Sequence, residues 1–445
     1  MNGKRKALLL AGLLILGGWG CLAVAQQPPI AQEQPIENED RIRVRVMLED
    51  IQKRLRKEYY DPSFHGVDIE GRFQEAKARI EKATSLNQAL GIIAWVLEGL
   101  NDSHTFFLPP PRPYDHDYGW RMVMVGEKCY VIAVKPGSDA ERQGLKTGDE
   151  VESVNGVVPT RETLPKIAYL FNILRPQPGL ILAVRTPDGQ QRTLEILAEF
   201  RQKKRTLRDP MDFYVELLDF QNARHLWRDR YHEVGSEVLI WKMPAFDMDP
   251  KAVDARIGKA REYKTLILDL RGNPGGRQDA LLRMIGHFFD QDVTLGEIKG
   301  RRETKPFRAK GRGQQAFQGK LIVLVDSRSA SAAELFARVV QLEKRGTVIG
   351  DKTAGAVMGA RIYPDTVGLE RIIVYAVMIT KDDLIMPDGK SLENAGTIPD
   401  EILLVSAADL ASQQDPVLAR AAALAGVSLT PQEAGKLFPI EWSKH

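Results

Sequence analysis

Apolar residues recur at helical spacing near the start of the chain. The pattern covers residues 42–59, 69–83 and 86–100. Thr84-Ser85 supplies a cap immediately before the third segment, and Pro109-Pro110-Pro111 ends the helical pattern, because proline lacks an amide hydrogen. The pattern predicts a helical N-terminal region over residues 40–108.

Short apolar segments separated by turn residues follow the prolines. Residues 131–134 and 151–154 have the composition of strands, and residues 140–144 have that of a short helix. Asn155-Gly156 ends the second strand, and this pair is a strong signal for a tight turn. The pattern predicts a small β domain over residues 109–200.

From residue 238 onward, apolar runs of strand length alternate with longer helical segments. The predicted strands are residues 238–241, 265–270 and 321–325. The predicted helices are residues 250–263, 278–289 and 332–342. This alternation is typical of an α/β core with a partly parallel sheet. We place the core at residues 201–430 and a C-terminal tail at residues 431–445, so that the whole chain is a multidomain α+β protein.

Two charged segments interrupt this order. Residues 201–208 form a charged run that is typical of a solvated linker, and residues 299–312 are rich in Lys, Arg and Gly. The second segment has no periodicity, so we interpret it as an exposed hairpin or loop rather than a nucleic-acid patch. No internal repeat is visible.

The first residues have the pattern of a secretory signal. Lys4-Arg5-Lys6 precede the apolar residues 7–16, and Ala23-Val24-Ala25 provides a small-residue cleavage site. We predict a signal peptide at residues 1–25, a disordered lead-in at residues 26–39, and an exported protein that is periplasmic or extracellular.

Two membrane-bound alternatives are less favoured. A transmembrane anchor needs a longer apolar stretch than this segment offers, so we expect no stable membrane span after cleavage. A lipid anchor through Cys21 is disfavoured because the bulky Trp19 lies close to the cleavage point.

Composition places the chain among ordinary globular proteins, with 43% hydrophobic and 27% charged residues. At 445 residues it is too long for one compact core, so two or three domains are expected. Cleavage after residue 25 would remove three of the 62 basic residues and no acidic residue, which leaves 59 of each sign. Nucleic acid is therefore not an expected partner.

The sequence offers no pattern of a metal or cofactor site. The exported chain would keep only Cys129, so no intrachain disulfide can form. CxxC and HExxH motifs are absent, and the seven histidines are scattered. We predict neither a metal nor a cofactor.

Ser331 is the strongest candidate for chemistry. It lies between the apolar run 321–325 and the predicted helix 332–342, within Ser329-Ala-Ser-Ala-Ala-Glu334. A strand that turns sharply into a helix presents such a hydroxyl at the end of a sheet, and the positive end of the helix favours negative charge there. The alternative is that Ser329 or Ser331 only caps the helix.

A glycine-rich turn is the second motif. Leu268-Asp-Leu-Arg-Gly-Asn-Pro-Gly-Gly276 leads from a strand into a helix, and paired glycines let backbone amides face a small anion. We interpret it as one half of an oxyanion hole, with Gly275 or Gly276 as one donor and the amide of Ala332 as the other. By itself the turn could bind phosphate or only reverse the chain.

Two later motifs complete the pattern. They are Gly350-x-x-Thr353-x-Gly355 and Glu393-Asn-x-Gly396-x-x-Pro399-Asp400. With Ser331 and the glycine turn, they resemble the C-terminal processing peptidase and tricorn superfamily of serine proteases, family S41. The resemblance covers roughly residues 40–405 and implies a ClpP/crotonase-like core.

The predicted β domain resembles a PDZ domain of the bacterial, protease-linked type. The match is Gly144-Leu-x-x-Gly-Asp149 followed by Asn155-Gly156. Such domains bind the end of an extended peptide, whose carboxylate is held by backbone amides. The resemblance places this loop at Tyr118, Gly119, Trp120 and Arg121. The alternative is a domain that only packs on the core.

One position departs from the processing-peptidase pattern. Ala356 stands where that subfamily carries its base, a lysine, and alanine accepts no proton. The tricorn branch instead uses a histidine next to a serine, and Ser103-His104 matches it. Histidine titrates near pH 6.5, which suits a base at neutral pH. The resemblance implies that Ser103 and Glu393 orient His104, although Glu393 could instead cap a turn.

These features predict an exported serine endopeptidase that binds polypeptide ends and cleaves by acyl transfer, with Ser331 as nucleophile and His104 as base. Protein or peptide substrates are the expected partners, and a homo-oligomer is possible. The alternative is an inactive peptide-binding or apolar-ligand-binding protein on the same fold. An esterase is a third reading, disfavoured because Gly-x-Ser-x-Gly is absent around Ser331.

Overall fold

The computed structural model describes residues 35–203, 228–368 and 372–442. The predicted signal peptide, Cys21 and most of the predicted lead-in lie outside these residues. Helix α1 begins at Asn38, so the predicted boundary of the lead-in at residue 39 is wrong by two residues. Among the described residues, no helix is long and apolar enough to cross a membrane.

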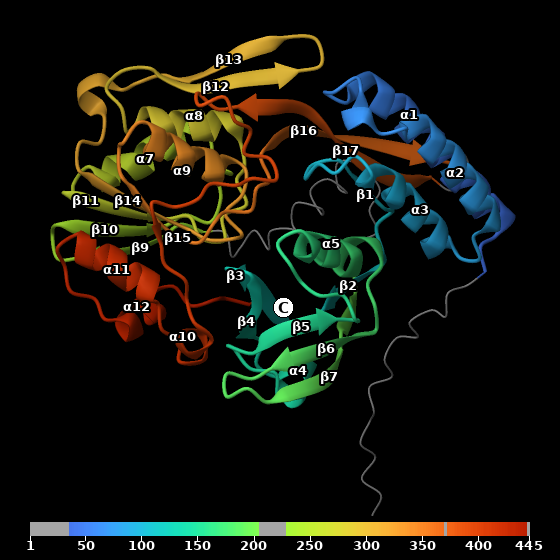
Figure 1. The fold of residues 1–445 in the computed structure, drawn as a ribbon, viewed down its shortest axis with the longest axis horizontal. Coiled ribbons are helices and arrows are strands. Elements are labelled where there is room, and N and C mark those ends of the chain that lie inside the picture. Colours follow the sequence, from blue (N-terminus) through green and yellow to red (C-terminus); the bar gives the residue numbers. More distant parts are fainter. Residues whose placement is uncertain (1–34, 204–227, 369–371, 443–445) are drawn as a thin grey trace, which may run out of the picture. The chain divides into compact units, whose positions relative to one another are not determined.

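Three helices pack on an antiparallel sheet (Figure 1). The helices are α1 (Asn38–Glu58), α2 (Ile69–Lys82) and α3 (Leu86–Glu98), with a 3-10 turn η1 (Phe64–Gly66) between the first two. The sheet has the order β1-β17-β12-β13, with β16 beside β17. Its strands are β1 (Phe106–Leu108), β12 (Val293–Gly300), β13 (Thr304–Ala309), β16 (Met358–Val367) and β17 (Ile373–Ile385). The helices bury their apolar sides against Phe107, Tyr375 and Val377 of these strands.

Two predictions for this part need correction. The N-terminal region is not purely helical, because β1 pairs with β17 and so belongs to a sheet built from distant residues. The charged segment 299–312 does form a hairpin, between β12 and β13, but it is not wholly exposed. Phe307 and Ala309 are buried, because one face of β13 packs on the core.

The middle of the chain forms a second antiparallel sheet, in the order β3-β4-β5-β6-β7. Its elements are β3 (Trp120–Val125), β4 (Lys128–Val134), α4 (Asp139–Arg142), β5 (Glu150–Val154), α5 (Thr163–Tyr169), η2 (Leu170–Leu174), β6 (Gly179–Arg185) and β7 (Gln191–Leu197). A separate pair joins β2 (Tyr114–Asp117) to β8 (Glu199–Gln202). The predicted linker at 201–208 is therefore wrong at its start, since Arg201 lies in β8, where Phe200 packs on Tyr114. Residues 204–208 lie outside the described residues.

The largest sheet is mainly parallel and has the order β18-β15-β14-β11-β10-β9. Its strands are β9 (Arg230–Val234), β10 (Val238–Lys242), β11 (Thr265–Asp269), β14 (Lys320–Val325), β15 (Thr347–Gly350) and β18 (Glu401–Ile402). Only β9 among them runs antiparallel to its neighbour. The predicted α/β core with a partly parallel sheet is confirmed, and the three predicted strands match to within one residue.

Helices cover both faces of this sheet (Figure 1). They are α7 (Pro250–Ala260), α8 (Gln278–Gly286) and α9 (Ala332–Leu342) on one face, and α11 (Pro416–Leu424) and α12 (Pro431–Leu437) on the other. The helix α10 (Ala407–Ala411) and the 3-10 turn η4 (Gly313–Gln315) have no buried residues. Side chains alternate along each strand. Leu239 and Trp241 face α7, α8 and α9, whereas Val238 and Ile240 face α11 and α12. The predicted tail at 431–445 is wrong, since it begins with α12, which Thr430 caps and Ala434 anchors.

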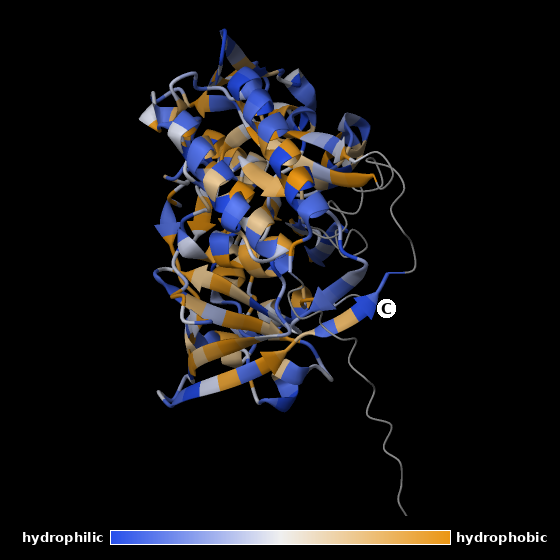
Figure 2. Ribbon diagram, turned by 90° about the vertical axis from the view of Figure 1, so that its right-hand side faces the viewer, coloured by the Kyte–Doolittle hydropathy of each residue, from blue (hydrophilic) through white to orange (hydrophobic). Residues whose placement is uncertain are grey.

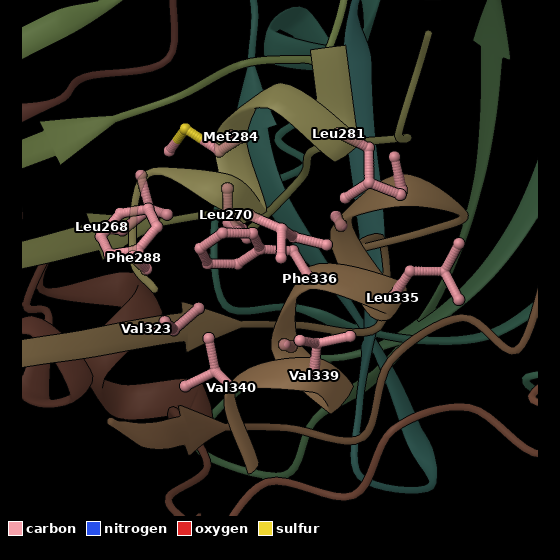
Figure 3. Close-up of a cluster of buried hydrophobic side chains, with 14 of the residues drawn as sticks. Leu268, Leu270, Leu281, Met284, Phe288, Val323, Leu335, Phe336, Val339 and Val340 are labelled. Atoms are coloured by element: carbon pink, nitrogen blue, oxygen red, sulfur yellow. The ribbon is translucent and has the colours of Figure 1, made fainter. Parts of the chain in front are cut away.

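The packing beneath α9 fixes the start of that helix. Leu335, Phe336, Val339 and Val340 lie on its buried side and belong to the core cluster, in which Figure 3 shows Phe336 beside Phe288. The rings of Phe336 and Phe288 meet edge to face with centroids 5.4 Å apart. Figure 2 colours the residues by hydropathy and shows largely hydrophobic strands beside helices of mixed hydropathy. The helix that begins at Ala332 is thereby held at the end of the sheet.

Phe336→Ala should lower the free energy of unfolding by about 3–5 kcal/mol, because it removes a fully buried ring and leaves a cavity. Denaturant unfolding followed by circular dichroism measures this change. Val46→Ala, an exposed position on α1, is the control and should change stability by less than about 0.5 kcal/mol. Equal effects of the two substitutions would contradict the packing described.

Candidate active site

Ser331 lies at the junction between the parallel sheet and α9. Strand β14 ends at Val325, and Ser331 is the residue immediately before the helix. Its φ of 52° and ψ of −117° form a sharp turn that a non-glycine residue rarely adopts. Ser329, in contrast, is fully buried, and its hydroxyl donates to the carbonyl of Leu270 at 2.9 Å. Of the two serines, Ser331 is therefore the candidate with an accessible hydroxyl.

The backbone amide of Ser331 is already engaged. It donates to the carboxylate of Glu334 at 2.9 Å and to the carbonyl of Ala356 at 3.0 Å. The next amide, that of Ala332, is at the first position of α9, where no intrahelical carbonyl is available. An anion next to Ser331 would therefore meet the amide of Ala332 rather than that of Ser331.

The glycine-rich turn lies directly against this junction. A Cβ on Gly275 would come within 2.6 Å of Ser331 Cβ and 2.8 Å of the Ala332 nitrogen, so only glycine fits. The amide of Gly275 donates to the side chain of Asn273 at 2.9 Å. The next residue, Gly276, forms a β-bridge with Phe246. In this bridge the Phe246 amide donates to the Gly275 carbonyl and the Arg277 amide donates to the Phe246 carbonyl, so the Gly276 amide takes no part in it. The structure thus brings the predicted turn and Ser331 together.

Ser103, His104 and Glu393 form a hydrogen-bonded chain. The hydroxyl of Ser103 is 2.6 Å from Nδ1 of His104 and donates to Glu393 Oε2 at 3.0 Å. Glu393 Oε1 also accepts the amide of Ser103 at 2.7 Å. These contacts join the turn after α3 to the loop after β17, although the two segments lie far apart in the sequence. Glu393 does not act only as a turn cap.

Glu393 also connects this chain to the Ser331 side of the site. Its Oε2 accepts the amide of Val357 at 2.8 Å, and the preceding residue, Ala356, accepts the amide of Ser331. His104 and Ser331 are therefore linked through Ser103, Glu393 and the Ala356–Val357 peptide. Within the described residues, no hydrogen bond joins Ser331 Oγ directly to His104.

Two carboxylates that sequence reasoning missed hold these segments in place. Asp102 accepts the amides of His104 and Thr105 at 2.9 and 2.7 Å, and the hydroxyls of Tyr59 and Thr380 at 2.8 and 2.7 Å. Glu334 is the second, and the spacing Ser331-x-x-Glu334 of a capping box could have indicated it. For Asp102 the only signal was its place directly before Ser103.

Burial changes the proton affinity of the candidate groups. It lowers the pKa of His104 below 6.5, against the charge of Asp102, which raises it. It raises the pKa of Glu393 above 4.5, against hydrogen bonds from Ser103 and Val357, which lower it. It also raises the pKa of Glu334 to about 7 despite four donors to that carboxylate. His104 is therefore neutral at pH 7.

Residues 237–403 match the sequence model of peptidase family S41. This range contains Ser331, the glycine turn and Glu393, while Ser103 and His104 precede it. This chain contains a peptidase family S41 domain.

Two curated relatives have related names. A carboxyl-terminal-processing protease of Synechocystis sp. is 25% identical over 296 residues, which are 64% of this chain and 62% of that protein. A probable CtpA-like serine protease of Staphylococcus haemolyticus is 30% identical over 140 residues, which are 31% of this chain and 27% of that protein. The chain thus spans less than two thirds of the length of either relative.

A solved structure has the same fold. The crystal structure of mature CPAF superposes with a TM-score of 0.63 at 15% identity, over 84% of this chain and 94% of that chain. Likeness at this identity concerns the arrangement of the elements alone. It extends the comparison beyond the S41 domain to most of the described chain.

A buried charge cluster underlies the glycine turn of the S41 domain. Asp269 is 1% exposed and pairs with Lys242 at 3.0 Å and with Arg271 at 2.8 Å. Arg271 also pairs with Asp415 at 2.7 Å, which ties the turn to α11. Burial would raise the pKa of Asp269, but the charges of Arg271 and Lys242 hold it well below its usual range. Asp269 is engaged in stabilising the end of β11.

The candidate peptide-binding residues have mixed environments. Tyr118 is buried, and its hydroxyl contacts the carbonyls of Phe171 and Gln177. Gly119 donates its amide to Asp117 at 2.8 Å. Trp120 and Arg121 begin β3, which is an edge strand of its sheet, and Arg121 stacks on Trp442. Among the described residues, no strand pairs with the outer edge of β3, although Ser327 binds the carbonyl of Met124. This edge and the exposed residue Arg121 are the parts of the segment that are open to a ligand.

The middle sheet contacts the S41 domain beside the Ser331 loops. Nη2 of Arg161 donates to both carboxylate oxygens of Asp351 at 2.8 Å, and Ser327 donates its hydroxyl to the carbonyl of Met124 at 2.5 Å. A cavity of about 990 Å³ lies next to these contacts, and Arg121, Asp326 and Asp351 are among its lining residues. Ser331 and His104 do not line it.

Gly275→Ala should destabilise the protein more than the same change at Gly189. Both glycines have φ near +92°, but a Cβ at Gly189 meets open space, whereas at Gly275 it meets Ser331 and Ala332. Gly189→Ala then costs only backbone strain, about 1–2 kcal/mol, and Gly275→Ala costs roughly 1–3 kcal/mol more from overpacking. Urea unfolding measures the difference. Equal losses would show that the turn does not press on Ser331 as described.

Proposed function

We propose that this protein is an exported serine-type endopeptidase that cleaves polypeptides by acyl transfer. Ser331 is the nucleophile, His104 the general base, and Ser103 with Glu393 orients the base. The observation that carries the proposal is the carboxylate of Glu393, which binds both Ser103 and the peptide bond next to Ala356, the partner of Ser331. The S41 domain, which contains Ser331, supports the same reaction class.

The hydrogen-bond chain supports a base role for His104. Ser103 has one hydroxyl hydrogen, and it points to Glu393, which already accepts two backbone amides and so favours its ionised form. Ser103 must then accept a hydrogen bond from Nδ1–H of His104. This tautomer leaves the lone pair of Nε2 free to take the proton of Ser331.

Acyl transfer follows from these roles. Ser331 Oγ attacks the carbonyl carbon of the scissile peptide while Nε2 of His104 takes its proton, and the carbonyl oxygen becomes an oxyanion. The amide of Ala332, at the positive end of α9, is the first proposed donor to that oxygen. In the glycine turn the amide of Gly275 is already bonded to Asn273, so the amide of Gly276 is the second proposed donor. His104 then donates the proton to the leaving amine, and water attacks the acyl-enzyme by the reverse sequence.

Substrate binding has to bring Ser331 and His104 into direct contact. The two side chains are held on different loops, joined by Glu393 and the Ala356–Val357 peptide. Catalytic hydrogen bonds are often long before the substrate binds and shorten in the complex. We propose that a peptide seated beside Ala356 closes this distance.

The middle sheet is proposed to act as a PDZ-like module for polypeptide ends. An extended peptide would add to the free edge of β3, with its carboxylate near Gly119 and Arg121. From there β3 runs toward Met124, whose carbonyl binds Ser327 in the loop that leads to Ser331. A peptide antiparallel to β3 therefore extends from its carboxylate toward the Ser331 loop.

The binding-protein alternative is less well supported. That alternative was based on Ala356, which stands at the position of the lysine base in processing peptidases and cannot accept a proton. In this chain the backbone of Ala356 has a different use, because its carbonyl accepts the Ser331 amide. The Ser103–His104–Glu393 chain supplies a base by another route, and a protein that only binds ligands has no need of it. We propose no cofactor and no nucleic-acid partner; export and self-association remain predictions.

A fluorophosphonate probe should label the wild-type protein and leave Ser331→Ala unlabelled. His104→Ala should lower kcat for peptide cleavage by about 10²–10⁴-fold, which is the usual contribution of a general base. Ser412→Ala and His232→Ala are matched controls, since both residues lie away from the candidate site, and they should behave as wild type. Equal labelling of wild type and Ser331→Ala would exclude Ser331 as the nucleophile.

A further inference from the structure

Glu334 is a buried carboxylate three residues after Ser331, and it receives hydrogen bonds from two segments. Oε2 accepts the amides of Ser331 at 2.9 Å and Ala356 at 3.0 Å. Oε1 accepts the hydroxyl of Thr353 at 2.5 Å and the amide of Gly355 at 2.7 Å. The side chain is fully buried. A capping interaction alone needs only the Ser331 amide, so the three bonds to residues 353–356 require another explanation.

The four donors match an ionised carboxylate. Its two oxygens offer about four lone-pair positions, and two donors reach each oxygen. Protonation would place a hydrogen on one of these oxygens and turn it toward groups that are themselves donors. At least one of the four bonds is then lost.

The segment that Glu334 holds also carries the other half of the candidate site. Thr353 donates to Glu334 and accepts the amide of Thr397, and Val357 donates to Glu393. The carboxylate thus ties the strained backbone of Ser331 to the segment that holds Glu393, and through Glu393 to His104. Without it, the nucleophile and the base would rest on loops with fewer shared contacts.

We infer that Glu334 is a positioning residue, which sets the distance and orientation between Ser331 and the His104 chain by binding the Ser331 amide and the Thr353–Ala356 segment together. The inference rests on the proposed function and concerns the same site. Among the described residues, the hydrogen bonds of the Glu334 carboxylate go to Ser331 N and to residues 353–356, and none goes to the Ser331 hydroxyl. Its effect is exerted through the backbone of Ser331 and the loop that ends at Val357.

This role has a consequence for pH dependence. Burial raises the pKa of Glu334 to about 7, and no ionisable side chain is among its hydrogen-bond partners. The titratable groups on the neighbouring loops are Asp351 and Lys352 before Thr353, and Glu393. Asp351 faces Arg161, and Glu393 faces Ser103, so both carboxylates are occupied elsewhere. Acidification through pH 7 therefore protonates Glu334 before it protonates His104, whose pKa lies below 6.5.

The test compares Glu334→Gln with wild type in peptide cleavage. In Gln, an NH₂ group replaces one of the two carboxylate oxygens. The two donors that bind this oxygen in wild type then face another donor, so two hydrogen bonds are lost. We expect kcat to fall about 10–100-fold, the cost of a misplacement on the order of 1 Å, with KM within about twofold of wild type. Glu343→Gln, at the exposed end of the same helix, is the matched control and should have wild-type kinetics.

The pH profile separates positioning from a purely structural role. For wild type, kcat/KM should fall on acidification in two steps, one near pH 7 from Glu334 and one below pH 6.5 from His104. Glu334→Gln should keep only the lower step. A folded Glu334→Gln protein with wild-type kcat, or one that retains the step near pH 7, would overturn the inference.

A second pair of variants covers the case in which Glu334→Gln does not fold. Thr353→Val keeps the shape of the side chain but removes the donor to Glu334 and the acceptor of the Thr397 amide, so kcat should fall. Thr353→Ser restores the hydroxyl and should recover most of that loss. Equal kcat for the two variants would contradict the inference. If wild type is neither labelled by a fluorophosphonate nor able to cleave peptides, the proposed function itself fails, which is a distinct result.

Discussion

The arrangement of the candidate site depends on carboxylates that accept backbone amides from loops distant in the sequence. Glu393 binds the amides of Ser103 and Val357, and Glu334 binds Ser331 and the loop after β15. Asp102 accepts the amides of the adjacent turn that contains His104, and its distant partners are the hydroxyls of Tyr59 and Thr380. An unpaired charge is costly inside a protein, so each carboxylate is stable only while its donors remain in place. The same requirement that keeps these groups satisfied therefore keeps the loops together.

Rigid elements place the loops within reach of these carboxylates. The parallel strands β11 and β14 deliver the glycine turn and the Ser331 loop to the same edge of the sheet, because parallel strands end on one side. Packing of α9 on α8 and the strands fixes its first residue, Ala332. In the antiparallel sheet that contains β17, strand β1 pairs with β17, which positions the turn around His104. The site thus lies where two separately packed sheets meet through their loops.

The middle sheet joins the same system at its edge. Arg161 pairs with Asp351, which lies two residues before Thr353. Ser327, in the loop that leads to Ser331, donates its hydroxyl to the carbonyl of Met124 in β3. Both loops that flank Ser331 are therefore in contact with the sheet whose free edge we propose to bind peptides. Through these contacts, a peptide bound at the edge of β3 would change the environment of the loops that hold Ser331.

The sequence by itself determined the local elements. Alternating strand and helix patterns predicted the α/β core, the strand-to-helix position of Ser331 and the glycine turn, because these depend on periodicity and on residues that permit special backbone angles. It did not reveal that Tyr118 is buried, that residues 431–437 form a helix, or that Asp102 and Glu334 hold the loops. The burial of Tyr118 and the partners of Asp102 depend on residues that are distant in the chain, and no local pattern encodes such contacts. Glu334 and the helix at 431–437 did have local signals, the capping boxes Ser331–Glu334 and Thr430–Glu433, but the contacts of Glu334 with residues 353–356 did not. Tertiary structure decided which carboxylates meet which amides, because burial makes each charge stable only beside donors that folding brings to it.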